Sequence, residues 1–146
     1  MTGTNHMQLQ FLGCPENESF ARVVIAAFAV QLSPTVSEIG DIKTAVSEAV
    51  TNAIVHGYEG TQGLVTLCAS YTPDGELLVE VSDSGKGIAD VAQAMTPFYT
   101  SRPQEERSGM GFAVMQTFMD HVEVTSRPGL GTVVRMHKTI AAAGGK

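Results

Sequence analysis

The sequence has few cysteines, few basic residues and no long apolar segment. Cys14 and Cys68 are the two cysteines in 146 residues, and each lies within or beside an apolar, strand-like stretch. This pattern favours neither a disulfide framework nor a CxxC metal site, and it fits a reducing cytoplasm. Nine Lys and Arg against 15 Asp and Glu give a formal net charge of −6. A negative protein is a poor match to the phosphate backbone, so we do not expect nucleic acid as a partner.

Hydrophobic runs are also short. The longest wholly apolar run spans eight residues, 23–30, whereas a membrane-spanning helix needs roughly twenty. The polar start of the chain lacks the basic cluster and apolar stretch of a signal peptide. We therefore expect a cytoplasmic protein without a membrane segment. A chain of 146 residues predicts one domain, 1–146, folded over about 7–138, with 141–146 as a loose tail.

Two helices are predicted in the first half of the chain, after a strand over 7–13. The first begins at Glu16 and ends near Ser33-Pro34, and its expected buried face comprises Phe20, Val23, Val24, Ala27 and Phe28. The second opens with Thr35 and Glu38, whose spacing is that of a capping box. It closes at His56-Gly57, because glycine readily adopts the left-handed conformation at a helix end.

The remaining chain reads as strands with one further buried helix. Expected elements are strands over 65–71 and 77–81, a short helix over 90–95, a loop over 96–109, a buried helix over 109–119, and strands over 121–126 and 131–138. Pro73-Asp74-Gly75 and Pro128-Gly129 supply the two hairpin turns. This order predicts an α+β fold, a two-layer sandwich of helices on one face of a mixed, mainly antiparallel sheet.

Three polar blocks are candidates for chemistry, and the first lies on the second helix. Glu48, Asn52 and His56 are spaced by four and form one polar strip. A carboxylate one turn from a carboxamide can accept a proton beside a Mg²⁺ ion that the amide oxygen ligates. The alternative is that the strip is the solvated side of the helix.

The second block is Asp83-Ser84-Gly85-Lys86-Gly87, directly after a strand. The alternation of that strand places Asp83 on the same side as its apolar residues, and a buried carboxylate needs hydrogen-bond donors. The exocyclic amine of a purine is such a donor, and glycines allow a flat ring to approach the backbone. The alternative is an ordinary turn that closes the strand.

The third block, Arg107-Ser108-Gly109-Met110-Gly111-Phe112, opens an apolar helix. The first turn of a helix leaves N–H groups unpaired and carries partial positive charge, which suits a phosphate. The block does not have the pattern of a P-loop, and it follows a polar loop instead of the strand that a dinucleotide-binding fold requires. Both of those nucleotide folds are disfavoured.

Together and in this order, the three blocks resemble the GHKL, or Bergerat, ATP-binding family. The stretch 48–53 resembles its N box, 83–87 its first glycine box and 107–111 its second. Within that family the chain is most similar, from about 7 to 137, to the anti-sigma F factors of spore-forming bacteria, which are serine kinases. The stretches that carry this similarity are 16–22, 47–57 and 107–112.

The resemblance implies ATP or ADP and Mg²⁺ as ligands. It assigns Glu48 as general base, Asn52 as the magnesium ligand and Asp83 as the group that recognises the adenine amine. Further implied nucleotide contacts are Gly85 and Gly87 around the base, Thr100, Ser101 and Arg107 on a lid over 96–109, and Gly109, Met110 and Gly111 at the helix start. Arg107 would also stabilise the transferring phosphoryl group, and Thr132 is a weaker candidate.

The resemblance also implies partners. They are a sigma factor that the protein inhibits, with Arg22 as the contact residue, and an anti-anti-sigma factor that it phosphorylates on a serine. A homodimer through the first strand and helix is implied as well. Three classes of function stay open: a protein serine kinase, a nucleotide-gated binding module without turnover, and a fragment of a histidine kinase or ATPase. Glu48 favours turnover, and His56, His121 and His137 lie within the domain rather than on a dimerising helix pair.

Overall fold

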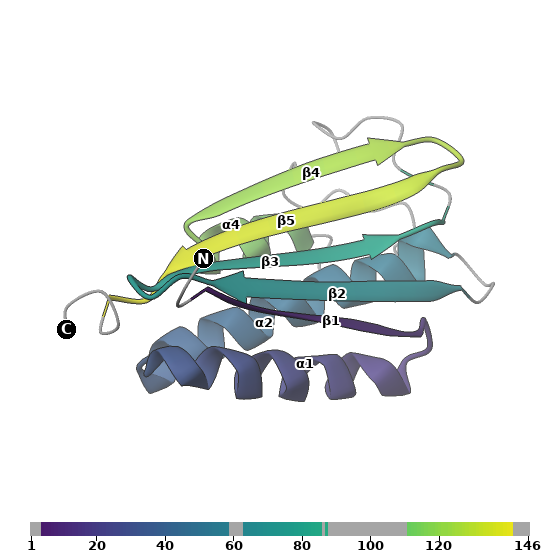
Figure 1. Cartoon of the computed structure of the whole chain (residues 1–146). Coiled ribbons are helices and arrows are strands. Elements are labelled where there is room, and N and C mark those ends of the chain that lie inside the picture. The colour runs from purple at the N-terminus through teal and green to yellow at the C-terminus, as the bar shows by residue number, and fades with distance from the viewer. Residues whose placement is uncertain (1–3, 59–62, 86, 88–110, 142–146) are drawn as a thin grey trace.

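The computed structural model describes residues 4–58, 63–85, 87 and 111–141, and it shows helices covering one face of a single sheet (Figure 1). The elements are β1 (Asn5–Leu12), α1 (Glu16–Ala29), η1 (Val30–Leu32), α2 (Val36–Asn52), η2 (Ala53–Gly57), β2 (Leu64–Tyr71), β3 (Glu76–Asp83), α4 (Gly111–Phe118), β4 (His121–Arg127) and β5 (Gly131–Thr139). The predicted α+β two-layer sandwich is confirmed.

The sheet has the strand order β1-β2-β3-β5-β4. We expected a mixed sheet, but all four of its pairings are antiparallel. The reason is in the connections: α1 and α2 run in opposite directions and return the chain to the end where β1 finished (Figure 1). Short turns join β2 to β3 and β4 to β5, and short turns of this kind connect antiparallel neighbours.

The α1 helix buries a different face from the one predicted. Its buried residues are Ala21, Ile25, Phe28 and Ala29. The prediction was right for Phe28 but wrong for Phe20 and Val23, which are 49% and 65% exposed, and for Ala27, which is also exposed. Apolar residues occupy most of the circumference of this helix, so the period of 3.6 residues did not identify the side that packs on the core.

The α2 helix begins as predicted and ends with an unpredicted change of winding. The Glu38 backbone N–H donates to Thr35 Oγ1 at 3.0 Å, and the Thr35 N–H donates to Glu38 Oε1 at 2.8 Å, which completes the capping box. After Asn52 the helix continues as the π-helical segment η2 and ends at Gly57. The π winding directs the Tyr58 N–H to the Ala53 carbonyl, at 3.1 Å. Such single π turns are frequent at functional sites.

The core lies between the helices and the inner face of the sheet. Its largest fully buried side chains are Ile25, Ile42, Leu67, Leu77, Met115, Met136 and Ile140, with Val46, Val50, Val65, Val79 and Val81. Both predicted hairpin turns are present, and Gly75 and Gly129 have positive φ angles of 93° and 79° there. The alternation of β3 continues to its last residue, so Asp83 enters the core side of the sheet, as predicted.

The direction of α4 follows from its contacts. It packs against α2, and Lys138 Nζ donates to the Phe118 carbonyl at 2.8 Å, so the helix ends near the end of β5. Gly111 at its start therefore points toward the opposite end of the sheet, where β3 ends and β5 begins (Figure 1). The predicted start of this helix at 109, the short helix over 90–95, the loop over 96–109 and most of the tail lie outside the described residues.

Candidate functional site

Asp83 is a buried carboxylate at the end of β3. It is 9% exposed, and its Oδ1 accepts a hydrogen bond of 2.9 Å from the Gly85 N–H. Burial raises the pKa of Asp83 above its ordinary value, while hydrogen bonds from the backbone N–H groups of Gly85 and Thr132 counteract part of the rise. A carboxylate held in this way is a functional-site candidate, because a ligand donor can offset its desolvation.

Two glycines let neighbouring backbone approach the turn that follows Asp83. Gly131 has a φ of 111° and lies close to the end of β3, so that a Cβ added there would be 2.1 Å from the Asp83 carbonyl oxygen. Gly87 has a φ of 77°, and a Cβ added there would be 2.1 Å from the Arg127 carbonyl oxygen. A side chain at either position would displace the turn from β5 or from the β4–β5 hairpin.

Thr132 is 3% exposed and lies directly opposite Asp83 on β5. Its Oγ1 lies 2.8 Å from Ser126 Oγ, and Ser126 donates its own proton to the Gly131 carbonyl at 3.0 Å. Thr132 is therefore the donor in the hydroxyl pair. Thr132 was a candidate from the family resemblance, whereas Ser126 and Gly131 were not predicted, because no local pattern distinguishes them from ordinary strand residues.

The polar strip of α2 reaches this same end of the sheet. Glu48 and Asn52 are half-buried rather than fully solvated. The η2 segment that follows Asn52 contacts both β3 and β5, and Figure 1 shows the end of α2 behind the tip of β3. The fold thus brings the end of α2, Asp83 and Thr132 to one end of the molecule. The side chain of His56 is outside the described residues.

Several predicted contacts cannot be placed. Gly85 and Gly87 lie in the turn after Asp83, and Gly111 is the first described residue of α4. Thr100, Ser101, Arg107, Gly109 and Met110, like Lys86, lie outside the described residues.

An open pocket of about 390 Å³ also lies at this end of the sheet. It is lined by Gln10, Tyr58, Gly63, Leu64, Thr66, Ser82, Asp83 and Ser84. Thr66 and Ser82 belong to the face of the sheet that the helices leave open, because they alternate with buried Val65 and Val81. Among the described residues that line the pocket, Asp83 is the one predicted site residue, and Glu48 and Asn52 are not among them.

Arg22 lies elsewhere, on α1. Its Nε is 3.6 Å from Glu18 Oε2, and its guanidinium donates to Ser19 Oγ at 3.3 Å. The side chain stays partly exposed, which a contact residue for a partner requires.

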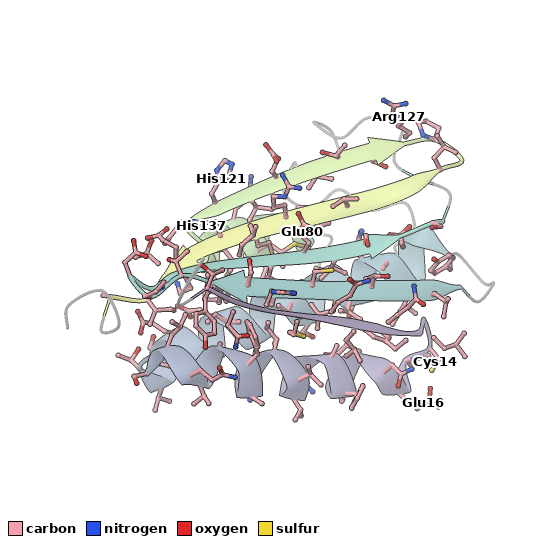
Figure 2. The ribbon with its side chains drawn as sticks, viewed as in Figure 1. Cys14, Glu16, Glu80, His121, Arg127 and His137 are labelled. Carbon is pink, nitrogen blue, oxygen red and sulfur yellow. The ribbon has the colours of Figure 1, made fainter. Side chains whose placement is uncertain are left out.

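The histidines of β4 and β5 lie at the far end of the sheet. His121 pairs with His137 across the two strands, and His137 Nε2 contacts Glu76. Figure 2 shows both rings well away from Arg127, which marks the β4–β5 turn beside the candidate site.

Cys14 and Cys68 are free thiols, and burial together with Glu80 raises the pKa of Cys68, as expected for an unreactive cysteine.

The donors at the end of α2 fit a magnesium ion. Mg²⁺ takes hard oxygen ligands and retains waters and substrate phosphates, so it needs one or two protein ligands. The Asn52 amide offers such an oxygen, one helical turn after the Glu48 carboxylate. Among the described residues no group of three His, Cys, Asp or Glu could hold a metal by itself.

No described helix has the length and apolar character that crossing a bilayer requires.

Comparison with known proteins identifies the class to which this fold and site belong. The family model for the histidine kinase-like ATPase domain matches residues 14–138. Among solved structures, the RsbU and RsbW domains from Mycobacterium tuberculosis share the fold with a TM-score of 0.68 at 17% identity, over 93% of this chain and 32% of that one. A histidine kinase domain from Erythrobacter litoralis has a TM-score of 0.55 at 20% identity, over 88% of this chain and 63% of that one.

Curated relatives define the family more narrowly. The anti-sigma F factor of Thermoanaerobacter sp. (strain X514) is 58% identical over 97% of this chain and 99% of its own length. Those of Clostridium acetobutylicum and Pasteuria penetrans are 58% and 51% identical, over 94% and 95% of this chain and 95% and 93% of theirs. The chain belongs to the anti-sigma F factor family of histidine kinase-like ATPase domains, and the resemblance found in the sequence is confirmed.

Proposed function

We propose that this protein is an ATP-dependent serine kinase that also binds and silences a sporulation sigma factor. Its kinase substrate is the anti-anti-sigma factor that opposes it. One observation carries the proposal: the helix that bears Glu48 and Asn52 ends against the strand that ends in the buried carboxylate Asp83. The names of the relatives support the sigma factor as the inhibited partner, and a sigma factor partner places the protein in the cytoplasm.

Nucleotide recognition begins at Asp83. Its carboxylate accepts a hydrogen bond from the adenine amine. This hydrogen bond replaces part of the solvation that the carboxylate lost on burial. Gly85 and Gly87 leave room for the base beside the backbone, and the hydroxyl of Thr132 completes the polar wall. ADP offers the same base and therefore binds to the same groups.

The phosphates lie between α2 and the start of α4. Asn52 would hold the magnesium ion, which would neutralise phosphate charge. The resemblance assigns phosphate contacts to Gly109, Met110 and Gly111, of which Gly111 begins α4, and the N–H groups at a helix start suit phosphate oxygens. The resemblance further assigns phosphate contacts to Arg107, Thr100 and Ser101 on a lid over 96–109, and the fixed donors of the Arg107 guanidinium match a phosphoryl group.

The chemical step is transfer of the γ-phosphoryl group to a serine hydroxyl. The bond from the γ-phosphorus to the bridging oxygen of ADP breaks, and a bond to the serine Oγ forms in line with it. Glu48 accepts the hydroxyl proton. The chain supplies placement and charge neutralisation, which are the main requirements of phosphoryl transfer.

Partner binding uses α1. Arg22 projects its partly exposed guanidinium for the sigma factor. A homodimer is supported by a second feature, the α1 stripe, defined as Phe20, Val23 and Ala27 of α1 together with Val30, the first residue of η1. These four residues are exposed and fall within about 80° of one helix face at 100° per residue. β1 is an edge strand of the sheet, and an exposed apolar seam such as this stripe marks a protein interface.

The test is a transfer assay with γ-labelled ATP, the purified protein and its anti-anti-sigma factor. Wild type should label a serine of the substrate, and Glu48→Gln should reduce the rate by about 10²- to 10⁴-fold while retaining ATP binding. Glu123→Gln, on an exposed carboxylate of β4, is the matched control and should transfer normally. Nucleotide-dependent sigma binding without any labelling by wild type would instead support a binding module without turnover.

A further inference from the structure

Tyr58 connects three segments at the candidate site. Its backbone N–H donates to the carbonyl of Ala53, the first residue of η2, at 3.1 Å. Its hydroxyl donates to the Leu64 carbonyl at the start of β2, at 2.5 Å. The same oxygen accepts a hydrogen bond of 2.9 Å from the Ser84 backbone N–H, 26 residues further along the chain. One residue, through its backbone N–H and its hydroxyl, thus joins η2, β2 and the turn after Asp83.

The ring that carries this hydroxyl has a fixed seat between two glycines. A Cβ on Gly63 would lie 2.3 Å from Cε1 of the Tyr58 ring, and one on Gly13 would lie 3.3 Å from Cδ2. Gly13 and Gly63 are themselves joined by a hydrogen bond of 2.7 Å between the Gly13 N–H and the Gly63 carbonyl. Because backbone encloses the ring at this distance, the hydroxyl has a defined position from which to hold Ser84.

We propose that Tyr58 is a positioning residue for base recognition, which fixes the purine-binding turn relative to α2. The inference rests on the proposed function. Ser84 stands between Asp83 and Gly85, and Gly85 donates to the Asp83 carboxylate at 2.9 Å. Holding the Ser84 N–H sets the plane of the Asp83–Ser84 peptide, and with it the direction in which the carboxylate meets the base.

Exposure distinguishes this role from a purely structural one. Ser84 is exposed, so water can replace the tyrosine hydroxyl as the acceptor of its N–H when that hydroxyl is removed. Loss of the hydroxyl should then leave the fold largely intact and release the turn. Asp83 would keep its burial but lose its fixed direction, and the preference for adenine over guanine should suffer most.

The experiment compares Tyr58→Phe with Tyr71→Phe in the full-length protein. Tyr71 is a matched control, because its hydroxyl also donates to one residue, Gln31 at 2.6 Å, and accepts from another, Asn5 at 3.2 Å. It lies at the other end of β2. Tyr58→Phe should weaken ATP binding about 5- to 10-fold, because the turn that carries Asp83 loses the hydrogen bond between Ser84 and the hydroxyl. It should lower the ATP/GTP preference by a similar factor, and raise KM without changing kcat.

A second variant tests the seat of the ring. Gly63→Ala keeps the hydroxyl but displaces the ring that carries it, and should reproduce the loss of base preference. Amide hydrogen exchange at Ser84 in nucleotide-free protein should become faster in both variants and stay unchanged in Tyr71→Phe. If wild type binds ATP and Tyr58→Phe has the same affinity, base preference and Ser84 exchange as wild type, this inference is wrong. The proposed function is not affected by that result. Absence of adenine nucleotide binding by wild type overturns the proposed function and this inference with it.

Discussion

Ser47 of α2 donates a hydrogen bond of 2.6 Å to the Glu18 carboxylate of α1. The same carboxylate oxygen faces the Arg22 guanidinium at 3.6 Å. Ser47 directly precedes Glu48, so the helix that carries the proposed general base and the arginine proposed for partner binding share one acidic side chain. The two proposed activities of the protein are therefore physically adjacent across the α1–α2 contact.

The hydrogen bond between Ser47 and Glu18 should contribute measurably to stability. Ser47→Ala leaves a partly buried carboxylate without one of its donors, so we expect the free energy of unfolding to fall by about 1 kcal/mol. Urea unfolding followed by circular dichroism measures this. Ser37→Ala, an exposed serine on the same helix, gives the same gain in helix propensity and should change stability by less than about 0.5 kcal/mol. Equal results for the two variants would show that the bond contributes nothing.

Asp83 should reduce the stability of the nucleotide-free protein at neutral pH. Its pKa is raised by burial, so the folded state holds this proton more tightly than the unfolded chain. Stability from this group is present at low pH and is lost as pH rises from the ordinary value of 3.8 through the raised pKa. Asp83→Asn should therefore stabilise the protein at pH 7 and weaken ATP binding roughly 10- to 100-fold.

Asp74→Asn is the matched control for that experiment, because it removes the same charge from an exposed turn. The Thr72 hydroxyl lowers the pKa of Asp74, so its ionised form stabilises the fold and the substitution should have the opposite sign at pH 7. Thermal unfolding of the three proteins between pH 4 and 7 tests both signs. A lower melting temperature for Asp83→Asn at pH 7 would contradict our account of Asp83.

Local signals in the sequence were sufficient where the physics is local. The capping box of Thr35 and Glu38, the turns at Gly75 and Gly129 and the inward direction of Asp83 each depend on neighbours within a few residues. The buried face of α1 was predicted wrongly because the helix is apolar on two sides. Which side packs on the core is decided by tertiary contacts that periodicity does not contain.

The candidate site was only partly predictable for the same reason. Glu48, Asn52 and Asp83 belong to short blocks whose chemistry is readable in sequence. Tyr58 acts through Ser84, 26 residues away, and Gly131 acts through the close approach of β5 to β3. Neither contact leaves a pattern in the neighbouring sequence, because each depends on which strands become adjacent after folding.

Gly131 should be intolerant of any side chain. Gly131→Ala places a Cβ 2.1 Å from the Asp83 carbonyl oxygen at a φ of 111°, and we expect a loss of more than about 3 kcal/mol in stability together with loss of ATP binding. Gly40→Ala is the contrast, because a Cβ there meets nothing within 4 Å on α2. It should stabilise the protein by about 0.5–1 kcal/mol. Wild-type stability in Gly131→Ala would mean that the two strands do not approach so closely.

The α1 stripe should hold the homodimer together. Val23 is 65% exposed, so Val23→Glu should change the stability of the monomer by less than about 0.5 kcal/mol. In a dimer the same change buries an unpaired charge in an apolar seam and should raise the dissociation constant at least about 10-fold. Thr44→Glu adds the same charge at an exposed site on α2 and should leave the dimer intact. Sedimentation velocity over a concentration series separates the cases: if wild type is a dimer and Val23→Glu dissociates no more readily than Thr44→Glu, the interface lies elsewhere. The exposed apolar side of α1 would then be available to the sigma factor instead.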